Sequence, residues 1–138
     1  MAELEFKRVR ESGLPELERL LSAYNPNAVI QGRYYMVVEE GTIKGVVGLL
    51  WRSWYLTELR HLYVKPEFRR SGVGRFLVGN ALGEVETPLA CCTISARNEE
   101  SAAVFRSLNF LPARRFHNER TGNEVILYLR QTQNEAYE

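Results

Sequence analysis

A basic, glycine-containing turn carries the clearest chemical signal in the sequence, and it reads Arg69-Arg70-Ser71-Gly72-Val73-Gly74-Arg75. An apolar run that ends at Pro66 precedes this turn, and apolar residues at helical spacing follow it. The first backbone N–H groups of a helix have no internal partner, and the helix dipole adds partial positive charge there. Glycine also lets a ligand come close to the backbone. A strand, a basic turn and a helix in this order predict a site for an anionic phosphate group.

Two common phosphate motifs do not fit this turn. A Rossmann fingerprint requires Gly or Ala where Leu77 stands, and a P-loop requires Gly-Lys followed by Ser or Thr, which the sequence lacks. The spacing that remains is Arg69-x-x-Gly72-x-Gly74 after a strand that ends in Val64. This spacing resembles the acyl-CoA pyrophosphate signature of the GNAT family of N-acetyltransferases.

A second block, Asn98-x-x-x-Ala102-x-x-Phe105-x-x-Leu108-Asn109-Phe110, resembles the motif N-x-x-A-x-x-x-Y-x-x-x-G-F of the same family in outline. Asn109 replaces a glycine, and Asn tolerates the left-handed conformation that ends many helices. Phe105 stands where the family often has the tyrosine that protonates the departing thiolate, and a phenyl ring cannot donate a proton. The chain also has one clear helix between its first two strands, where the family usually has two, so we expect a more open acceptor site.

The resemblance implies transfer of an acetyl group from acetyl-CoA to a primary amine, by direct attack in a ternary complex and without a metal. It implies that residues 69–75 hold the pyrophosphate and that Asn98 hydrogen-bonds the pantetheine arm, with Phe105 beside the cofactor. It also implies that a backbone N–H within Leu62, Tyr63 and Val64 polarises the thioester carbonyl.

The amine must lose a proton before it attacks, because an ammonium ion has no lone pair. Glu58 is the predicted base, since it lies six residues before Val64, where several family members carry a catalytic Glu or His. Counting by two along a strand puts Arg60, Leu62 and Val64 on the face of Glu58 and His61 on the other. Alternatively, Glu58 is a surface carboxylate paired with Arg60 or with a neighbouring strand.

Two routes remain open for the departing thiolate. Tyr63 could be the acid if a bulge brought it to the face of Glu58. Otherwise no acid is needed, since a simple thiol has a pKa near ~8.5 and leaves as the anion.

Length and composition predict one soluble domain over residues 1–130 and a polar tail over 131–138. The net charge of +1 argues against a nucleic-acid binder that uses the arginines. No apolar run approaches the roughly 20 residues of a membrane span, and the polar N-terminus is unlike a signal peptide, so we expect a cytoplasmic protein. Cys91 and Cys92 are neighbours on a strand, which favours two buried reduced thiols over a disulfide or metal site.

Hydrophobic periodicity predicts a mixed α/β fold in the order β-α-β-β-β-α-β-α-β-β, with a central sheet of about seven strands flanked by helices, as in the GNAT family. The expected strands cover 4–10, 34–39, 42–51, 54–64, 89–95, 113–119 and 125–130. Ser12 is expected to cap the first helix, the signature helix is expected over 72–86, and Asn98 is expected to cap the third.

Two further alternatives stay open. A domain that keeps an acyl-CoA pocket but acts as a sensor or interaction module would also explain Phe105. Trp51, Trp54 and Tyr55 form an aromatic cluster that is either partly buried in the core, or a homodimer contact or a wall of the acceptor site.

Overall fold

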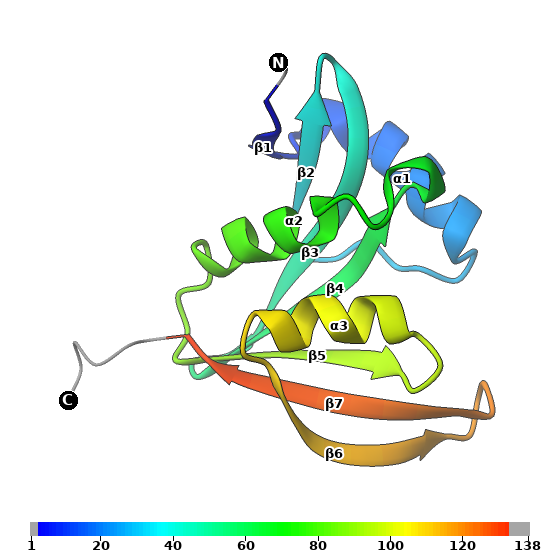
Figure 1. Ribbon diagram of the computed structural model, residues 1–138, viewed down its shortest axis with the longest axis vertical. Coiled ribbons are helices and arrows are strands. Elements are labelled where there is room, and N and C mark those ends of the chain that lie inside the picture. Colours follow the sequence, from blue (N-terminus) through cyan, green and yellow to red (C-terminus); the bar gives the residue numbers. More distant parts are fainter. Residues whose placement is uncertain (1–2, 133–138) are drawn as a thin grey trace.

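The computed structural model describes residues 3–132, which form one seven-stranded sheet with helices on both faces (Figure 1). The strands occur in the spatial order β1-β2-β3-β4-β5-β7-β6. Their bounds are β1 Glu5–Arg8, β2 Arg33–Glu39, β3 Thr42–Ser53, β4 Leu56–Val64, β5 Leu89–Ser95, β6 Leu111–Asn118 and β7 Asn123–Gln131. The helices are α1 Leu14–Tyr24, α2 Val73–Leu82 and α3 Glu99–Ser107, with short 3-10 turns at Glu11–Gly13 and Pro66–Phe68. The predicted fold class and element order are confirmed.

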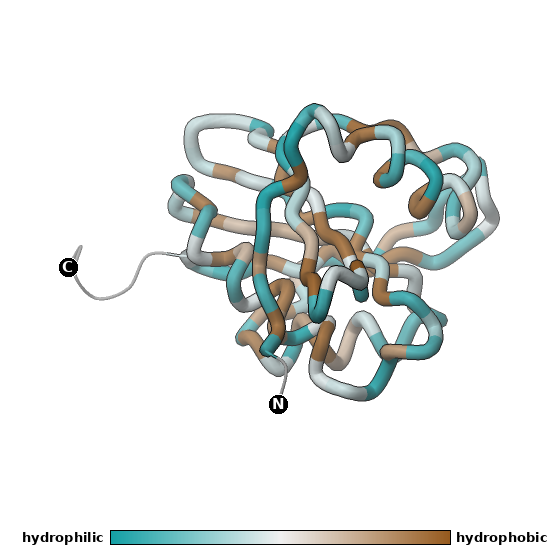
Figure 2. Tube along the Cα trace, turned by 90° about the horizontal axis from the view of Figure 1, so that it is seen from above, coloured by the Kyte–Doolittle hydropathy of each residue, from teal (hydrophilic) through white to brown (hydrophobic). Residues whose placement is uncertain are grey.

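Each face of the sheet has its own hydrophobic core. Residues such as Val47, Leu49 and Leu59 pack with buried side chains of α2 and α3, including Leu77 and Phe105. On the opposite face, α1 packs Leu17 and Leu21 against buried Tyr34 and Val46. Hydrophobic stretches gather where the sheet and the helices meet, and hydrophilic stretches follow the outer turns (Figure 2). The sheet is therefore covered by packed helices on both faces.

Strands β4 and β5 are the one parallel pair in this sheet, and they are joined over only a short stretch. Leu56, Thr57 and Glu58 pair with Leu89, Ala90 and Cys91, and beyond these residues the described strands share no further pairs. Figure 1 shows the two strands starting side by side and then diverging. The separation leaves unpaired backbone N–H and C=O groups along both inner edges, which an extended ligand can pair with.

A bulge in β4 changes which side chains share a face. Arg60 pairs with Gly48 and Tyr63 pairs with Val46, so both His61 and Leu62 lie opposite Val47. His61 has a φ of 54°, a left-handed conformation that is uncommon for a residue other than glycine.

The bulge makes part of the predicted alternation wrong. Leu62 and Val64 pack on the core beneath α2, away from the face of Glu58. Conversely, His61 hydrogen-bonds Tyr34 on the α1 face, where Tyr63 also packs. The extra residue therefore places Glu58, Arg60, His61 and Tyr63 together.

Several element boundaries differ from the predicted ones. Ser12 does not cap α1; it lies inside the 3-10 turn, and Gly13 occupies the cap position without a side-chain hydrogen bond. Helix α2 ends at Leu82 rather than near residue 86, because Gly83, Glu84 and Val85 each donate to the carbonyl three residues back and tighten the chain. Trp54 and Tyr55 form the turn before β4 instead of its first residues.

Other predictions of local structure are confirmed. Asn109 ends α3 with a φ of 69°, and Cys91 and Cys92 are buried free thiols. Strand β7 continues to Gln131, one residue into the predicted tail, and residues 133–138 of that tail lie outside the described residues. Within residues 3–132, every helix is too short or too polar to span a bilayer.

The aromatic cluster at the β3–β4 turn is exposed. Trp51 is 71% exposed and Trp54 is 78% exposed, which rules out partial burial in the core, the first of the alternatives considered for this cluster. A dimer contact and an acceptor wall remain predictions for this cluster.

Candidate active site

The basic turn that precedes α2 is held open towards solvent. Gly72 is the cap residue of α2, with a φ of 86° that glycine adopts without strain, and no side chain caps the first N–H groups of the helix. A Cβ built at Gly72 would have no neighbour within 4 Å, so this side of the backbone is free for a ligand. The unsatisfied N–H groups and the dipole of α2 suit an anion at this position.

The arginines of the turn have different surroundings. Arg69 donates from Nε to the carbonyl oxygen of Val64 at 2.8 Å, which fastens the turn to the end of β4. Ser71 fastens it again by donating its hydroxyl to the carbonyl of Phe68. Arg70 and Arg75 are exposed and have no ion-pair partner among residues 3–132. Their charges are therefore available to a phosphate.

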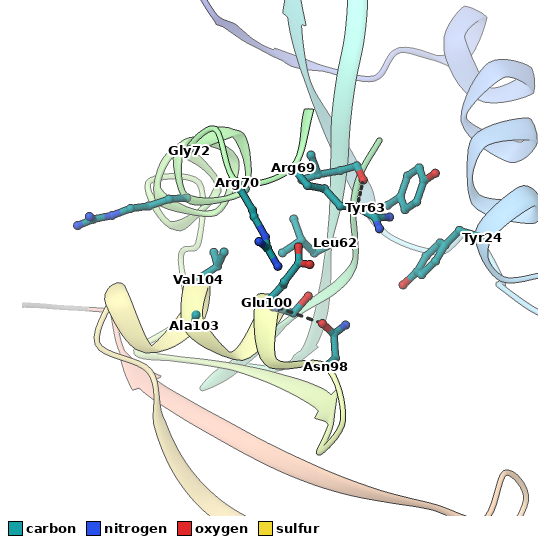
Figure 3. Close-up of a pocket in the computed structure, with 14 residues that line it drawn as sticks. Tyr24, Leu62, Tyr63, Arg69, Arg70, Gly72, Asn98, Glu100, Ala103 and Val104 are labelled. Carbon is teal, nitrogen blue, oxygen red and sulfur yellow. Dashed lines mark hydrogen bonds between the residues drawn. The ribbon is translucent and has the colours of Figure 1, made fainter. Parts of the chain in front are cut away.

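A first cavity of about 500 Å³ opens between this turn and α3 (Figure 3). It is lined by Tyr24, Leu62, Tyr63, Val64, Arg69, Arg70, Gly72, Gly74, Arg75, Asn98, Glu100, Ser101, Ala103 and Val104. In Figure 3 the Arg70 side chain extends from the turn towards Glu100 of α3. A Cβ at Gly74 would lie 3.4 Å from Val104 and 3.6 Å from Val64, so this glycine keeps α2 close to its neighbours.

Most of the predicted cofactor residues come together in this cavity. Asn98 caps α3 by accepting a hydrogen bond from the N–H of Ser101 at 3.1 Å, and its side chain also faces the cavity. Ser71 and Val73 belong to the same turn but support it: Val73 is buried against the core, and Ser71 bonds to Phe68.

A second cavity of about 550 Å³ lies between the diverging strands β4 and β5. Its lining includes Glu58, Arg60 and His61 from β4, Thr93 and Ser95 from β5, and Phe105 from α3. It shares Tyr24, Leu62, Asn98 and Ser101 with the first cavity. The two cavities therefore meet at the gap in the sheet.

Glu58 is held by an arginine of the neighbouring strand. Arg52 donates to Oε1 of Glu58 from Nε at 2.9 Å and from Nη2 at 2.7 Å. Among residues 3–132, no hydrogen bond reaches Oε2 of Glu58, which leaves that oxygen free for a proton or a water. Of the two partners considered for Glu58, Arg60 forms no ion pair with it in the described chain, and the observed partner, Arg52, lies on the neighbouring strand β3.

His61 faces the second cavity, although counting along the strand placed it on the other side. Its Nδ1 lies 2.7 Å from the hydroxyl oxygen of Tyr34, and the two rings are stacked. Burial lowers the pKa of His61, and the nearby charge of Arg60 lowers it further, against the opposing effect of Glu58. The imidazole is therefore neutral at neutral pH.

Arg60 is partly buried at the same cavity. Its Nε is inaccessible to solvent and forms no hydrogen bond within the described chain. Its Nη2 lies 3.5 Å from Nε2 of His61. The guanidinium therefore has unused donors.

Comparison with known proteins decides the family. The model of the acetyltransferase (GNAT) family matches residues 2–110. The chain belongs to the GNAT acetyltransferase family. A comparison with curated protein sequences finds no match.

Solved structures of GNAT acetyltransferases share the fold at low sequence identity. A GNAT family acetyltransferase of Elizabethkingia anophelis with acetyl-CoA bound has a TM-score of 0.82 at 14% identity, over 93% of this chain and 97% of that one. The ribosomal-protein-S18-alanine N-acetyltransferase of Escherichia coli has a TM-score of 0.77 at 15% identity, over 96% of both chains. The spermidine/spermine N-acetyltransferase of Vibrio cholerae has a TM-score of 0.75 at 14% identity, over 94% and 95%.

The position of the usual GNAT tyrosine is apolar here. Phe105 is 2% exposed and packs edge-to-face on Phe110, with ring centroids 5.0 Å apart. Its ring lines the second cavity without a polar group.

Tyr24, at the end of α1, is a site residue that was not predicted from the sequence. It falls on the apolar stripe of that helix, and the sequence therefore predicts only that it packs in the core. It stacks on Tyr63 with ring centroids 4.8 Å apart, and it lines both cavities. Figure 3 shows its hydroxyl directed into the cavity, on the side of Asn98. Partial burial and the neighbouring Tyr34 raise the pKa of Tyr24, so the hydroxyl keeps its proton. Within residues 3–132, no group of three or more His, Cys, Asp or Glu residues is arranged to hold a metal ion.

Proposed function

We propose that this GNAT protein transfers an acetyl group from acetyl-CoA to a primary amine by direct attack in a ternary complex. The observation that carries the proposal is the gap between β4 and β5, where a cavity beside the basic turn meets a cavity that contains Glu58. Such an arrangement lets two substrates approach from different sides and react without a covalent enzyme intermediate. The bound acetyl-CoA of the Elizabethkingia relative supports the choice of co-substrate.

In this proposal, three parts of the chain bind acetyl-CoA. The turn and the first residues of α2 bind the pyrophosphate through backbone N–H groups and the charges of Arg70 and Arg75. The pantetheine arm lies in the gap along Leu62, Tyr63 and Val64, where the inner edge of β4 has unpaired backbone groups. Asn98 and Ser101 face the arm from α3, and Phe105 closes the apolar side of the gap.

The reaction requires a base and a polarised carbonyl. Oε2 of Glu58, directly or through a water, takes a proton from the ammonium form of the acceptor. The amine lone pair then forms the C–N bond with the thioester carbon, and a backbone N–H in Leu62–Val64 stabilises the resulting oxyanion. The attacking nitrogen loses its second proton to water, and collapse of this intermediate breaks the C–S bond and releases coenzyme A as a thiolate.

Two hydroxyl groups are candidates for the general acid that protonates the thiolate. Tyr63 lies on the face of Glu58 because of the bulge, and Tyr24 directs its hydroxyl into the cavity. Either could protonate the thiolate in place of the missing tyrosine at position 105. A third possibility is departure of the thiolate without an acid, since a thiol is a tolerable leaving group.

A direct test is mass spectrometry after incubation with acetyl-CoA and a panel of amino acids, polyamines, aminoglycosides and peptides with free amines. We expect one acetylated class of product, and Glu58→Gln should slow its formation by about 100-fold or more while acetyl-CoA still raises the melting temperature.

A non-catalytic acyl-CoA sensor is the second candidate, and Phe105 is the observation that favours it. Acetyl-CoA binding without any acetylated product would support that candidate. We further propose a cytoplasmic location, since two buried, unpaired cysteines suit a reducing compartment.

A further inference from the structure

The surroundings of Arg60 indicate what kind of amine the second cavity accepts. Strand β4 places Arg60 opposite Gly48, so no side chain of β3 stands directly across from it. The buried Nε has no hydrogen-bond partner in residues 3–132, and the contact of Nη2 with His61 is long, at 3.5 Å. Because this Nε is closed to a ligand as well as to water, a ligand in the cavity must use the terminal Nη donors of Arg60. A partly buried cation with so few polar partners is unfavourable unless such a ligand supplies them.

Among the described residues, no negative charge near the Arg60 guanidinium balances its positive charge. No carboxylate lies within ion-pair distance of Arg60 in the described chain, and the carboxylate of the same cavity, Glu58, is bound to Arg52. His61 adds no negative charge in either of its protonation states. The charged side chains that line the second cavity are therefore Glu58, which is already paired with Arg52 outside the lining, and the uncompensated Arg60.

We propose that the amine acceptor carries a carboxylate and that Arg60 binds it, with the amine directed towards Glu58. This inference rests on the proposed transferase function and specifies its acceptor. The planar guanidinium can donate two parallel hydrogen bonds to a carboxylate, a geometry that an ammonium group cannot reproduce. A polyamine would instead bring further positive charge against Arg60. A cavity of about 550 Å³ has room for an amino acid or for the first residue of a peptide.

The carboxylate can come from two sources. One is a free amino acid or a related small amino-carboxylate, and the other is an acidic side chain beside the terminal amine of a peptide. Both present the same group to Arg60, so the experiment includes free amino acids, peptides that begin with Asp or Glu, and peptides that begin with Asn or Gln.

The first measurement is isothermal titration of the protein saturated with coenzyme A, which does not depend on turnover. The ligands are matched sets: amino acids of several chain lengths with their carboxamides and decarboxylated amines, and peptides that begin with Asp or Glu with their counterparts that begin with Asn or Gln. We expect at least one carboxylate ligand to bind about ten-fold or more tightly than its carboxamide. Equal affinities for all pairs, or no binding by any ligand of the panel, would overturn the inference.

Substitutions test whether Arg60 causes the preference for carboxylate ligands. Arg60→Gln should remove the preference for the carboxylate, Arg60→Lys should keep part of it, and the control Arg114→Gln should leave it unchanged. Arg114 lies on the outermost strand β6, far along the sheet from β4. Because the buried Nε of Arg60 makes no hydrogen bond to the chain, Arg60→Gln should fold and melt no earlier than the unchanged protein. A carboxylate preference that survives Arg60→Gln would also overturn the assignment.

Measurements of turnover distinguish a failure of this inference from a failure of the transferase proposal on which it rests. Acetylation of amines with and without a carboxylate at similar kcat/KM would refute the role of Arg60 and leave the transferase proposal intact. Carboxylate-dependent binding with no acetylated product would support the role of Arg60 and refute the transferase proposal.

Discussion

The hydroxyl oxygen of Tyr34 lies 2.7 Å from Nδ1 of His61, and this contact joins the second strand of the sheet to the bulge in the fourth. His61 holds a left-handed backbone conformation at that point. Residues keep such conformations where the surrounding structure requires them, and they cluster at functional sites. The contact therefore helps to fix the bulge that sets the geometry of the site.

The lowered pKa of His61 predicts a loss of stability in acid. The unfolded chain takes up a proton near the ordinary pKa of 6.5, whereas the folded protein resists protonation to a lower pH. Stability from this residue is therefore complete above about pH 6.5 and declines as the pH falls from there towards the folded pKa. Urea denaturation across this range should show the decline, and His61→Gln should weaken it. An equal pH dependence in both proteins would contradict the prediction.

Gly48 provides the space that the Tyr34 ring occupies. A Cβ at this position would lie 2.5 Å from Cε2 and 2.7 Å from Cζ of Tyr34, so Gly48→Ala should displace the ring and destabilise the protein by about 1–3 kcal/mol. Gly79→Ala is the matched control, because its nearest neighbour would be Leu108 at 3.9 Å. Gly79 lies inside α2, where alanine should stabilise the helix by about 0.5–1 kcal/mol. Chemical denaturation of both variants should give changes of opposite sign.

The two candidate acids can be separated by removing one oxygen atom at a time. Tyr24→Phe and Tyr63→Phe both keep the stacked pair of rings, so neither should disturb acetyl-CoA binding through lost packing. Because the Tyr24 hydroxyl points into the cavity, we expect Tyr24→Phe to lower kcat by up to about 100-fold and Tyr63→Phe to have the smaller effect. The reverse order would assign the role to Tyr63, and two unchanged rates would show that the thiolate leaves without an acid.

The cysteines should not react in the folded protein. Burial raises the pKa of Cys91 to about 11 and also raises that of Cys92, and the charge of Glu58 acts in the same direction on both thiols. Both are protonated at neutral pH, and only a thiolate reacts rapidly with disulfide reagents. A thiol reagent should therefore detect no cysteine in the native protein and 2 after denaturation. Rapid native labelling of either cysteine would contradict this prediction and would also interfere with assays of released coenzyme A.

The sequence predicted the parts of the site that depend on local chemistry. Arg69, Gly72 and Gly74 indicated the phosphate turn, because strand, turn and helix follow one another along the chain. The order of elements followed from periodicity and turn residues, and Asn98 and Asn109 were identified at the two ends of α3.

Features that depend on pairing between distant segments could not be predicted. The bulge at His61 has no glycine to indicate it, and its presence follows from the register of β3 against β4. Without that register, counting along the strand placed His61 and Val64 on the wrong faces. The partner of Glu58 was likewise hidden, because Arg52 approaches it only after the β3–β4 turn reverses the chain. Tyr24 gave no signal beyond an apolar stripe.

The bulge has a consequence for how this protein can diversify. Glu58, Arg60 and, through the bulge, His61 lie on the side of the sheet covered by α1, while the basic turn belongs to the side covered by α2. Substitutions that alter acceptor choice therefore need not pass through residues that hold acetyl-CoA. Directed evolution that randomises only Arg60 and His61 on the α1 side of β4 should yield variants with new acceptors and an unchanged affinity for the acyl donor.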